Sequence, residues 1–176
     1  MIGVAIPIPD PYGPELRRWR LSFGDAPAAA IPTHITLLPP TEVVAARLPD
    51  IGAHLAAVAA RHPAFHIRLR GTATFRPVSP VVFVVLAGGT AECERVEHDV
   101  RSGPLARELR FPYHPHVTVA HDLSDDVLDR AFNELAGYDA AFRACGFSLY
   151  EHGDDGIWYR RRDFSFGGDP PSAGPA

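Results

Sequence analysis

The first forty residues alternate between the hydrophobic spacing typical of strands and that typical of helices. Residues 2–8 are rich in alternating β-branched side chains, which predicts a strand, and residues 14–23 carry apolar side chains at helical spacing. A short β-type run follows at residues 33–38. We expect this strand to stop at Pro39-Pro40, because proline has no amide hydrogen with which to continue a ladder.

The middle of the chain predicts a helix between strands. Residues 51–59 place apolar side chains on one helical face, and residues 65–69 alternate as a strand does. The run 81–86, Val-Val-Phe-Val-Val-Leu, is apolar at every position, which is typical of a strand covered on both faces. We therefore expect a buried central strand there.

The second half of the chain repeats this order of elements. A helix is expected around residues 93–100, then a second short β run at 115–120 and a helix after residue 124. Strand-like runs at 143–150 and 157–166 are joined by a Gly-Asp-Asp-Gly sequence, which is a hairpin signal. Because each half passes through a short strand, a helix and further strands, we expect the two halves to form facing lobes.

Composition places the chain among globular proteins. Of its 176 residues 46% are hydrophobic, no apolar run approaches the ~20 residues that cross a bilayer, and the first residues have the pattern of a strand, not of a secretion signal. The net charge of −4 gives no basic field for coating long nucleic acid, which leaves a small nucleotide or an RNA terminus as the ligand to consider. We expect a cytoplasmic monomer without membrane contact, with one domain over residues 1–166 and a disordered Gly-, Pro- and Ala-rich tail over 167–176.

Two short motifs of the form His-x-Thr carry the candidate chemistry. They are His34-Ile-Thr36 and His116-Val-Thr118, and each lies in one of the two short β runs, with the histidines 82 positions apart. Because side chains alternate along a strand, each motif presents its imidazole and its hydroxyl on one face. A single histidine on a strand is more often structural, but chance would supply only about 0.36 such motifs here, so two in matching settings favour a function.

Imidazole and hydroxyl groups in this arrangement suit phosphoester chemistry. With an ordinary pKa of about 6.5, a neutral imidazole can take a proton from water, and a protonated one can give a proton to a leaving oxygen near pH 7. Threonine hydroxyls can donate hydrogen bonds to non-bridging phosphate oxygens and stabilise the charge that develops there. We therefore expect one histidine to act as base and the other as acid around a phosphorus atom, without a metal or another cofactor.

The sequence around both motifs resembles a known family. The strings Pro32-Thr-His34-Ile-Thr36-Leu-Leu-Pro-Pro40 and Pro115-His116-Val-Thr118-Val are similar to the paired signatures of the two-histidine (2H) phosphoesterase superfamily, which includes bacterial 2′-5′ RNA ligase-like proteins and cyclic nucleotide phosphodiesterases. The resemblance covers roughly residues 1–166 and implies an α+β fold, with two pseudo-symmetric lobes of mainly antiparallel sheet and outer helices around a central cleft. It also implies metal-independent cleavage of 2′,3′-cyclic phosphate or 2′-5′ phosphodiester bonds in nucleotides or at RNA ends. The two motif histidines would be acid and base, and the two threonines would hold the phosphate.

Three further residues are candidates for lining the site. Several ligase-like members carry an arginine shortly after the second motif, where this chain has Ala120-His121. Strand alternation places His121 on the side of Val117, opposite to the motif face. Phe75 and Arg76 precede the 81–86 strand and are suited to stack on a base or contact a phosphate, the alternatives being core packing and a solvated charge.

Two other functions fit the same residues less well. His114, His116 and His121 would make a metal site, but no Asp, Glu or Cys stands at ligand spacing within the same strand. A non-catalytic module that binds phosphate or an RNA end would use the same donors, but binding alone does not require two acid/base groups. We therefore place catalysis ahead of both.

Overall fold

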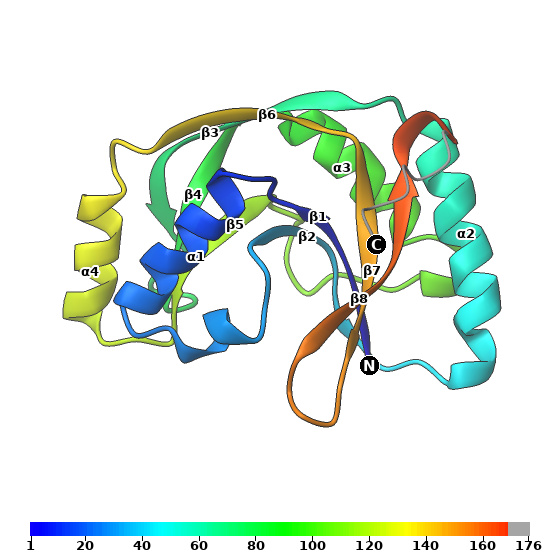
Figure 1. Ribbon diagram of the computed structural model, residues 1–176, viewed down its shortest axis with the longest axis horizontal. Helices are drawn as coiled ribbons and strands as arrows, with labels where there is room; N and C mark the ends of the chain where they lie inside the picture. The colour runs from blue at the N-terminus through cyan, green and yellow to red at the C-terminus, as the bar shows by residue number, and fades with distance from the viewer. Residues whose placement is uncertain (169–176) are drawn as a thin grey trace.

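The computed structural model describes residues 1–168, which form two four-stranded antiparallel sheets with helices on their outer sides (Figure 1). This confirms the expected α+β architecture. The first sheet has the strand order β2-β1-β7-β8 and the second has the order β5-β4-β3-β6. The strands are β1 (Ile2–Pro7), β2 (His34–Thr41), β3 (Phe65–Thr74), β4 (Val81–Gly88), β5 (His116–His121), β6 (Asp139–Ala144), β7 (Gly146–His152) and β8 (Trp158–Ser165).

The two sheets are not the two halves of the chain. The first sheet combines strands from both ends of the described chain, whereas all strands of the second come from the middle. After β2 the chain passes to the second sheet, where β3 pairs with β4 and β6. It returns to the first sheet at β7, which pairs with β1. The lobes are therefore interleaved, which corrects the expectation that each half of the sequence builds its own lobe.

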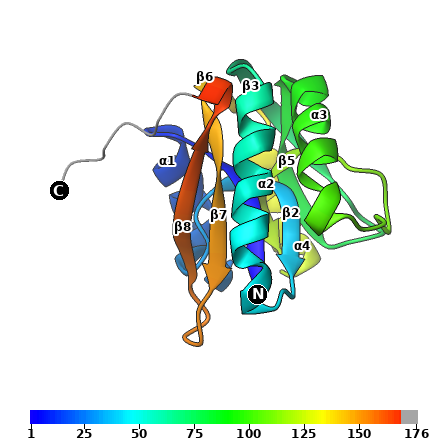
Figure 2. The ribbon, with the colours of Figure 1, turned by 90° about the vertical axis from the view of Figure 1, so that its right-hand side faces the viewer.

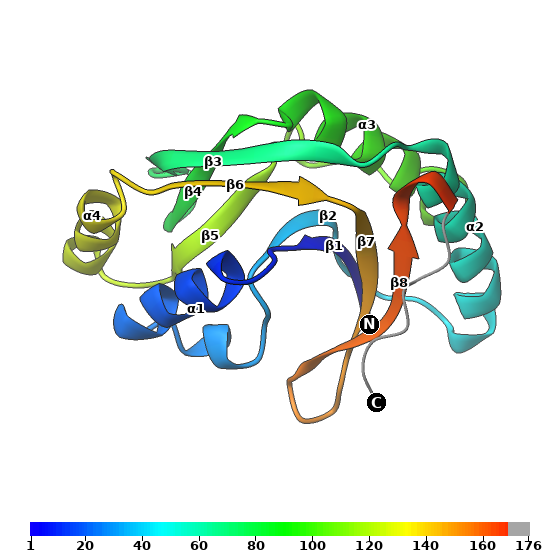
Figure 3. The same ribbon diagram turned by 45° about the horizontal axis from the view of Figure 1, so that its top comes forward.

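The α-helices lie in two pairs on opposite flanks of the sheets (Figures 1 and 3). On one flank α1 and α4 are neighbours, and Arg130 Nη2 donates to the carbonyl of Ser22 at 3.3 Å. On the other flank α2 and α3 pack together beside the first sheet (Figure 2). The helices are α1 (Tyr12–Ser22), α2 (Leu48–Arg61), α3 (Thr90–Val100) and α4 (Asp125–Glu134), with short 3₁₀ turns η1 (Ala26–Ala29), η2 (Ala45–Arg47), η3 (Gly103–Leu105) and η4 (Phe166–Gly168).

Each helix buries one apolar stripe, as helical spacing requires. Leu16 of α1, Leu55 of α2, Val96 of α3 and Leu128 of α4 are all fully buried in one continuous core. α1 follows β1 of the first sheet but contacts β5, the His-x-Thr strand of the second sheet. α3 follows β4 of the second sheet but contacts β2, the His-x-Thr strand of the first. None of the helices within residues 1–168 combines the length and the apolar character that a bilayer crossing requires.

Strand predictions from the sequence succeed inside the sheets and fail at an edge. β4 lies between β5 and β3 with Val82 and Val84 fully buried, which confirms the central strand. β2 does not stop at Pro39-Pro40 but continues to Thr41, which pairs with Ile2. The prolines are tolerated because β2 is an edge strand and its pairing with β1 is irregular at this point.

An extra residue follows the His-x-Thr motif in each sheet. In β2 the partner of Ala5 is Thr36 and the partner of Val4 is Leu38, so Leu37 is bulged. In β5 the same step in the register occurs between Thr118 and Ala120. Such a bulge lets two consecutive residues turn toward the core, and both residues after each motif are buried.

The C-terminal part differs from its prediction in two places. The strand expected over residues 143–150 is two strands, β6 and β7, interrupted at the exposed Cys145. The tail expected to be disordered from residue 167 begins inside η4, where the Gly167 amide donates to the carbonyl of His62 at 2.9 Å. The remaining residues of that prediction, 169–176, lie outside the described part of the chain.

Candidate active site

The two His-x-Thr motifs lie on neighbouring strands of the two sheets. β2 and β5 contact each other, and His34 and His116 are the first residues of these strands. Tyr113, three residues before His116, is largely buried and donates its hydroxyl to the carbonyl of Thr36 at 2.9 Å. The structure thus joins the approach to the second motif directly to the backbone of the first.

Both imidazoles are oriented by the same backbone bond. His34 Nδ1 lies 2.6 Å from the carbonyl oxygen of Pro32, and His116 Nδ1 lies 2.7 Å from that of His114. A carbonyl oxygen can only accept, so Nδ1 carries the hydrogen in each ring. In the neutral form each Nε2 is then the basic nitrogen, which is the one that can take up a proton.

The hydroxyl groups of the two motifs differ in their partners. Thr36 Oγ1 lies 3.1 Å from His34 Nε2, and because that nitrogen is unprotonated in the neutral ring, the hydroxyl donates. Among the described residues no equivalent bond joins Thr118 to His116. The first motif is therefore an internally bonded pair, while the second leaves its imidazole nitrogen and its hydroxyl separate.

Burial lowers the pKa of both histidines. For His34 desolvation is the main cause, opposed by the bond to Pro32, and the nearby cation of Arg20 lowers the pKa further. For His116 desolvation again dominates, opposed by the bond to His114, and the rings of His114 and His34 add to the lowering. Both imidazoles are consequently neutral at pH 7 when no anion is bound.

Phe75 lies beside the second motif. Its ring centroid is 4.9 Å from that of His116 with the planes perpendicular, and Phe83 approaches the same imidazole at 5.1 Å. His114 packs edge-on against both phenylalanines, and its ring is 6.5 Å from His116. These aromatic rings restrict the rotation of the His116 side chain, whose Nδ1 is already bonded to the carbonyl of His114.

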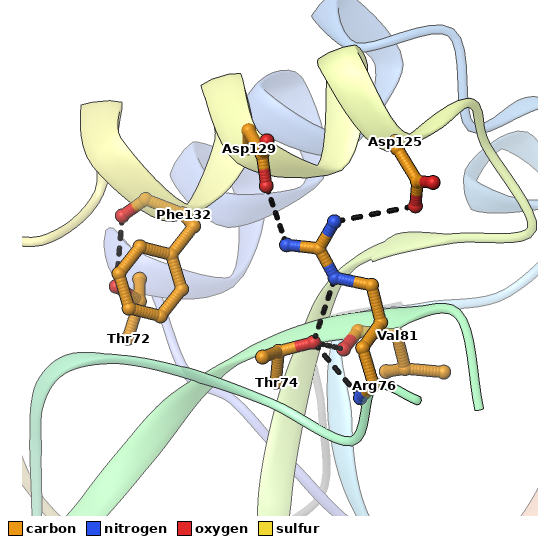
Figure 4. Close-up of polar contacts among 7 residues, drawn as sticks. All are labelled: Thr72, Thr74, Arg76, Val81, Asp125, Asp129 and Phe132. Carbon is orange, nitrogen blue, oxygen red and sulfur yellow. Dashed lines mark hydrogen bonds and ion pairs between the residues drawn. The ribbon is translucent and has the colours of Figure 1, made fainter. Parts of the chain in front are cut away.

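Arg76, the neighbour of Phe75, is directed to helix α4 instead (Figure 4). Its guanidinium binds Asp129 at 2.6 Å and Asp125 at 3.3 Å, and Nε lies 3.4 Å from Thr74 Oγ1. These contacts join the β3–β4 connection to the start of α4. The structure therefore gives Arg76 a bridging position between elements and does not turn it toward the imidazoles.

His121 lies at the other end of β5 from His116. The bulge after Thr118 puts His121 back on the face of the motif, so the simple alternation that placed it with Val117 was wrong. Its side chain is 46% exposed and Nε2 is 3.3 Å from Asp122 Oδ2. Within residues 1–168 no three His, Cys, Asp or Glu side chains converge as metal ligands, so the alternative cluster of His114, His116 and His121 does not form.

A cavity of about 200 Å³ opens beside the first motif. His34 and Thr36 form one side of it, and the aromatic side chains of Tyr150 and Trp158 form another. Gly3 lies next to the indole, and a Cβ on this residue would stand 3.4 Å from Trp158 Cζ3, which is an ordinary van der Waals contact. The other lining residues are apolar: Val4, Ala5, Ile31, Pro32, Leu38 and Pro40.

Sequence reasoning missed Tyr150 and Trp158 as members of the site. They lie on β7 and β8, which reach the first motif only because β7 pairs with β1 across nearly the whole chain. Nothing in the local sequence signals this pairing. The hairpin prediction was confirmed, but it did not tell which sheet the hairpin joins.

Comparison with known proteins supports the family and the architecture. Residues 8–156 match the model of the 2′-5′ RNA ligase superfamily. The chain is 27% identical over 146 residues to a candidate phosphoesterase of Geobacillus kaustophilus (82% of this chain, 84% of that protein) and 29% identical over 141 residues to one of Bacillus licheniformis (79% and 83%). The crystal structure of E. coli LigT complexed with NADP+ matches with a TM-score of 0.67 at 20% identity, covering 94% of this chain and 97% of LigT. The chain therefore belongs to the 2′-5′ RNA ligase superfamily, a group of phosphoesterases.

Proposed function

We propose that this protein is a metal-independent phosphodiesterase that cleaves 2′,3′-cyclic phosphate or 2′-5′ phosphodiester bonds of nucleotides or RNA ends. The observation that carries the proposal is the matched bonding of the two imidazoles. In each, Nδ1 is fixed by the carbonyl two residues earlier, so both Nε2 atoms are the groups left for proton transfer. Binding a phosphate would not require two such groups, whereas acid/base catalysis does.

In the proposed reaction one imidazole takes a proton from water while the other gives one to the leaving ribose oxygen. A P–O bond forms to the water oxygen and the P–O bond to the ribose breaks, so the reaction consumes one water molecule. The anionic phosphate raises the pKa of a nearby imidazole, which offsets the lowering by burial and lets one histidine be protonated near pH 7. When substrate binds, the Thr36 hydroxyl turns its hydrogen from His34 Nε2 to a non-bridging oxygen, and the Thr118 hydroxyl donates to another.

The cavity beside His34 supports a nucleoside substrate. Its apolar lining and its two aromatic side chains suit a flat base attached to the reacting ribose phosphate. Crystal structures of E. coli LigT, which shares the fold, have been determined with 3′-AMP, ATP and phosphate. We extend nucleotide binding to this chain as part of the proposal.

A substrate panel with chelator present tests this function. Purified protein in EDTA is incubated with adenosine 2′,3′-cyclic phosphate, a 2′-5′-linked diadenylate and its 3′-5′ isomer, and products are separated by chromatography. We expect cleavage of the cyclic phosphate or the 2′-5′ dimer at an undiminished rate in EDTA. Binding of these nucleotides without any cleavage would replace the proposal by a binding module, and activity that returns only with zinc or manganese would contradict metal independence.

A further inference from the structure

A second, larger cavity adjoins the one beside His34. It measures about 440 Å³ and lies between the α1–η1 region and the β7–β8 hairpin. The two cavities share three lining residues, Pro32, Tyr150 and Trp158, and are therefore adjacent. A ligand that fills the first cavity therefore has a second space next to it.

The second cavity carries positive charge on a protein whose net charge is −4. Its charged lining residues are Arg17 and Arg160, and no acidic residue lines it. Arg17 is held in place by donating to the carbonyls of Ala28 at 2.9 Å and Ala29 at 2.7 Å. Arg160 donates Nε to Asp163, which leaves its terminal nitrogens for a ligand. Two guanidinium groups without a carboxylate in the same lining are suited to a phosphodiester.

The spacing of the strands sets the distance between Arg160 and the strand that carries His34. Arg160 pairs with Tyr150, and Tyr150 pairs with Gly3 of β1, the neighbour of β2. Arg160 is thus three strand spacings, about 14 Å, from the strand of His34. Trp158, whose side chain lines both cavities, lies between. Its backbone amide donates to the carbonyl of Ala30 at 3.1 Å, and its indole packs against the ring of His152 with the centroids 5.0 Å apart.

We infer that the second cavity binds the nucleotide preceding the reacting terminus, with Arg17 and Arg160 at its phosphodiester and Trp158 stacked against a base. The inference rests on the proposed function and narrows it. The substrate is the end of an oligonucleotide, and a free cyclic mononucleotide fills only the first cavity. Arg160 then determines specificity without touching the phosphate that is cleaved.

The test compares two adjacent arginines of β8 on two substrates. Arg160 lines the second cavity, whereas Arg161 is bound to Glu151 at 2.8 Å and lines neither cavity. KM and kcat are measured in EDTA for adenosine 2′,3′-cyclic phosphate and for a triadenylate ending in the same cyclic phosphate. Arg160→Gln is expected to raise KM for the triadenylate about tenfold or more and to leave the mononucleotide unchanged. Arg161→Gln should change neither.

Salt dependence gives a second readout of the same contact. Loss of one phosphate contact should flatten the plot of log KM for the triadenylate against log salt by about 0.7 in slope, and only for Arg160→Gln. Both variants should fold normally, since Asp163 keeps the hydroxyl bond from Ser148 at 2.7 Å, and thermal unfolding checks this. An Arg160→Gln variant that behaves as Arg161→Gln, or that weakens both substrates equally, overturns the inference.

Failure of the proposed function looks different. In that case the intact protein cleaves neither substrate, and the inference is then judged by binding. The dissociation constant of a fluorescent triadenylate 3′-phosphate, measured by anisotropy, should still rise about tenfold in Arg160→Gln and stay unchanged in Arg161→Gln. Equal affinities in the two variants would reject the second cavity as a nucleotide site.

Discussion

The two His-x-Thr motifs share a backbone design but have different surroundings. Each begins a strand, holds Nδ1 on the carbonyl two residues earlier and is followed by a bulged residue. His34 faces an open apolar cavity and accepts a bond from Thr36, whereas His116 is packed among Phe75, Phe83 and His114. The repeated backbone thus orients both Nε2 atoms in the same way, while the surroundings give each histidine its own environment.

The largest loss of turnover is expected when either imidazole is removed. If one histidine is base and the other acid, His34→Ala and His116→Ala each lose the ~10²- to 10⁴-fold acceleration of general acid/base catalysis. Because the two groups act as a unit, the double variant should be little worse than either single one. His98→Ala, which changes an exposed histidine on α3, is the matched control and should keep full turnover. Wild-type turnover in both motif variants would disprove the two-histidine mechanism.

Replacing either threonine should reduce turnover less than removing an imidazole, and the two threonine variants should differ from each other. Thr36→Val and Thr118→Val keep the side-chain shape but remove one donor to the phosphate, which should cost about 1–3 kcal/mol in transition-state binding for each. In the free protein the Thr36 hydroxyl donates to His34 Nε2, so only Thr36→Val should also shift the pH-rate profile of kcat/KM. Kinetics from pH 5 to 9 measure both effects. Identical profiles for the two variants would show that the asymmetry has no catalytic consequence.

The lowered pKa values of the two histidines predict how stability depends on pH. The unfolded pKa is near 6.5, and the folded pKa of each ring lies below it. The unfolded chain therefore binds more protons as the pH falls below 6.5, so the folded state should be fully stabilised above this pH and destabilised below it. Thermal unfolding at pH 7.5 and 5.5 should show a smaller decrease in Tm for His34→Ala and His116→Ala than for the wild type. A decrease of the same size in all three proteins would contradict the assigned directions.

The smallest effect is expected at Arg76, beside the second motif. Its contacts with Asp125 and Asp129 are at an exposed helix surface, so Arg76→Gln should lower the free energy of unfolding only slightly. Turnover should remain unchanged because the side chain points to α4 (Figure 4). Denaturant unfolding and steady-state kinetics measure the two quantities. A large loss of turnover with normal stability would return Arg76 to the site.

What could be predicted from the sequence was local. The alternation that puts His34 with Thr36 and His116 with Thr118 depends only on strand geometry, and the apolar run at 81–86 is buried wherever its sheet lies. For the same reason the Gly-Asp-Asp-Gly hairpin was found correctly. These features need no knowledge of distant partners.

What failed depended on partners far away in the chain. The continuation of β2 through Pro39-Pro40 and the face of His121 both follow from irregular pairing with a neighbouring strand, which the sequence of one strand does not contain. The contacts of Arg76 with Asp125 and Asp129 on α4 were not foreseen either, because these carboxylates lie some fifty residues later in the chain. The aromatic wall of Tyr150 and Trp158 was missed for the same reason.

The interleaving of the sheets has a consequence for how the protein is made. All four strands of the second sheet lie between residues 65 and 144, so that sheet can form from one continuous segment of the chain. The first sheet is different, because β1 and β2 precede this segment in the sequence and β7 and β8 follow it. Their pairing closes a loop of nearly the full chain length and is expected to be the slow step of folding. The cavity beside His34, which is lined by residues of β1, β2, β7 and β8, is therefore complete only after this long-range pairing has formed.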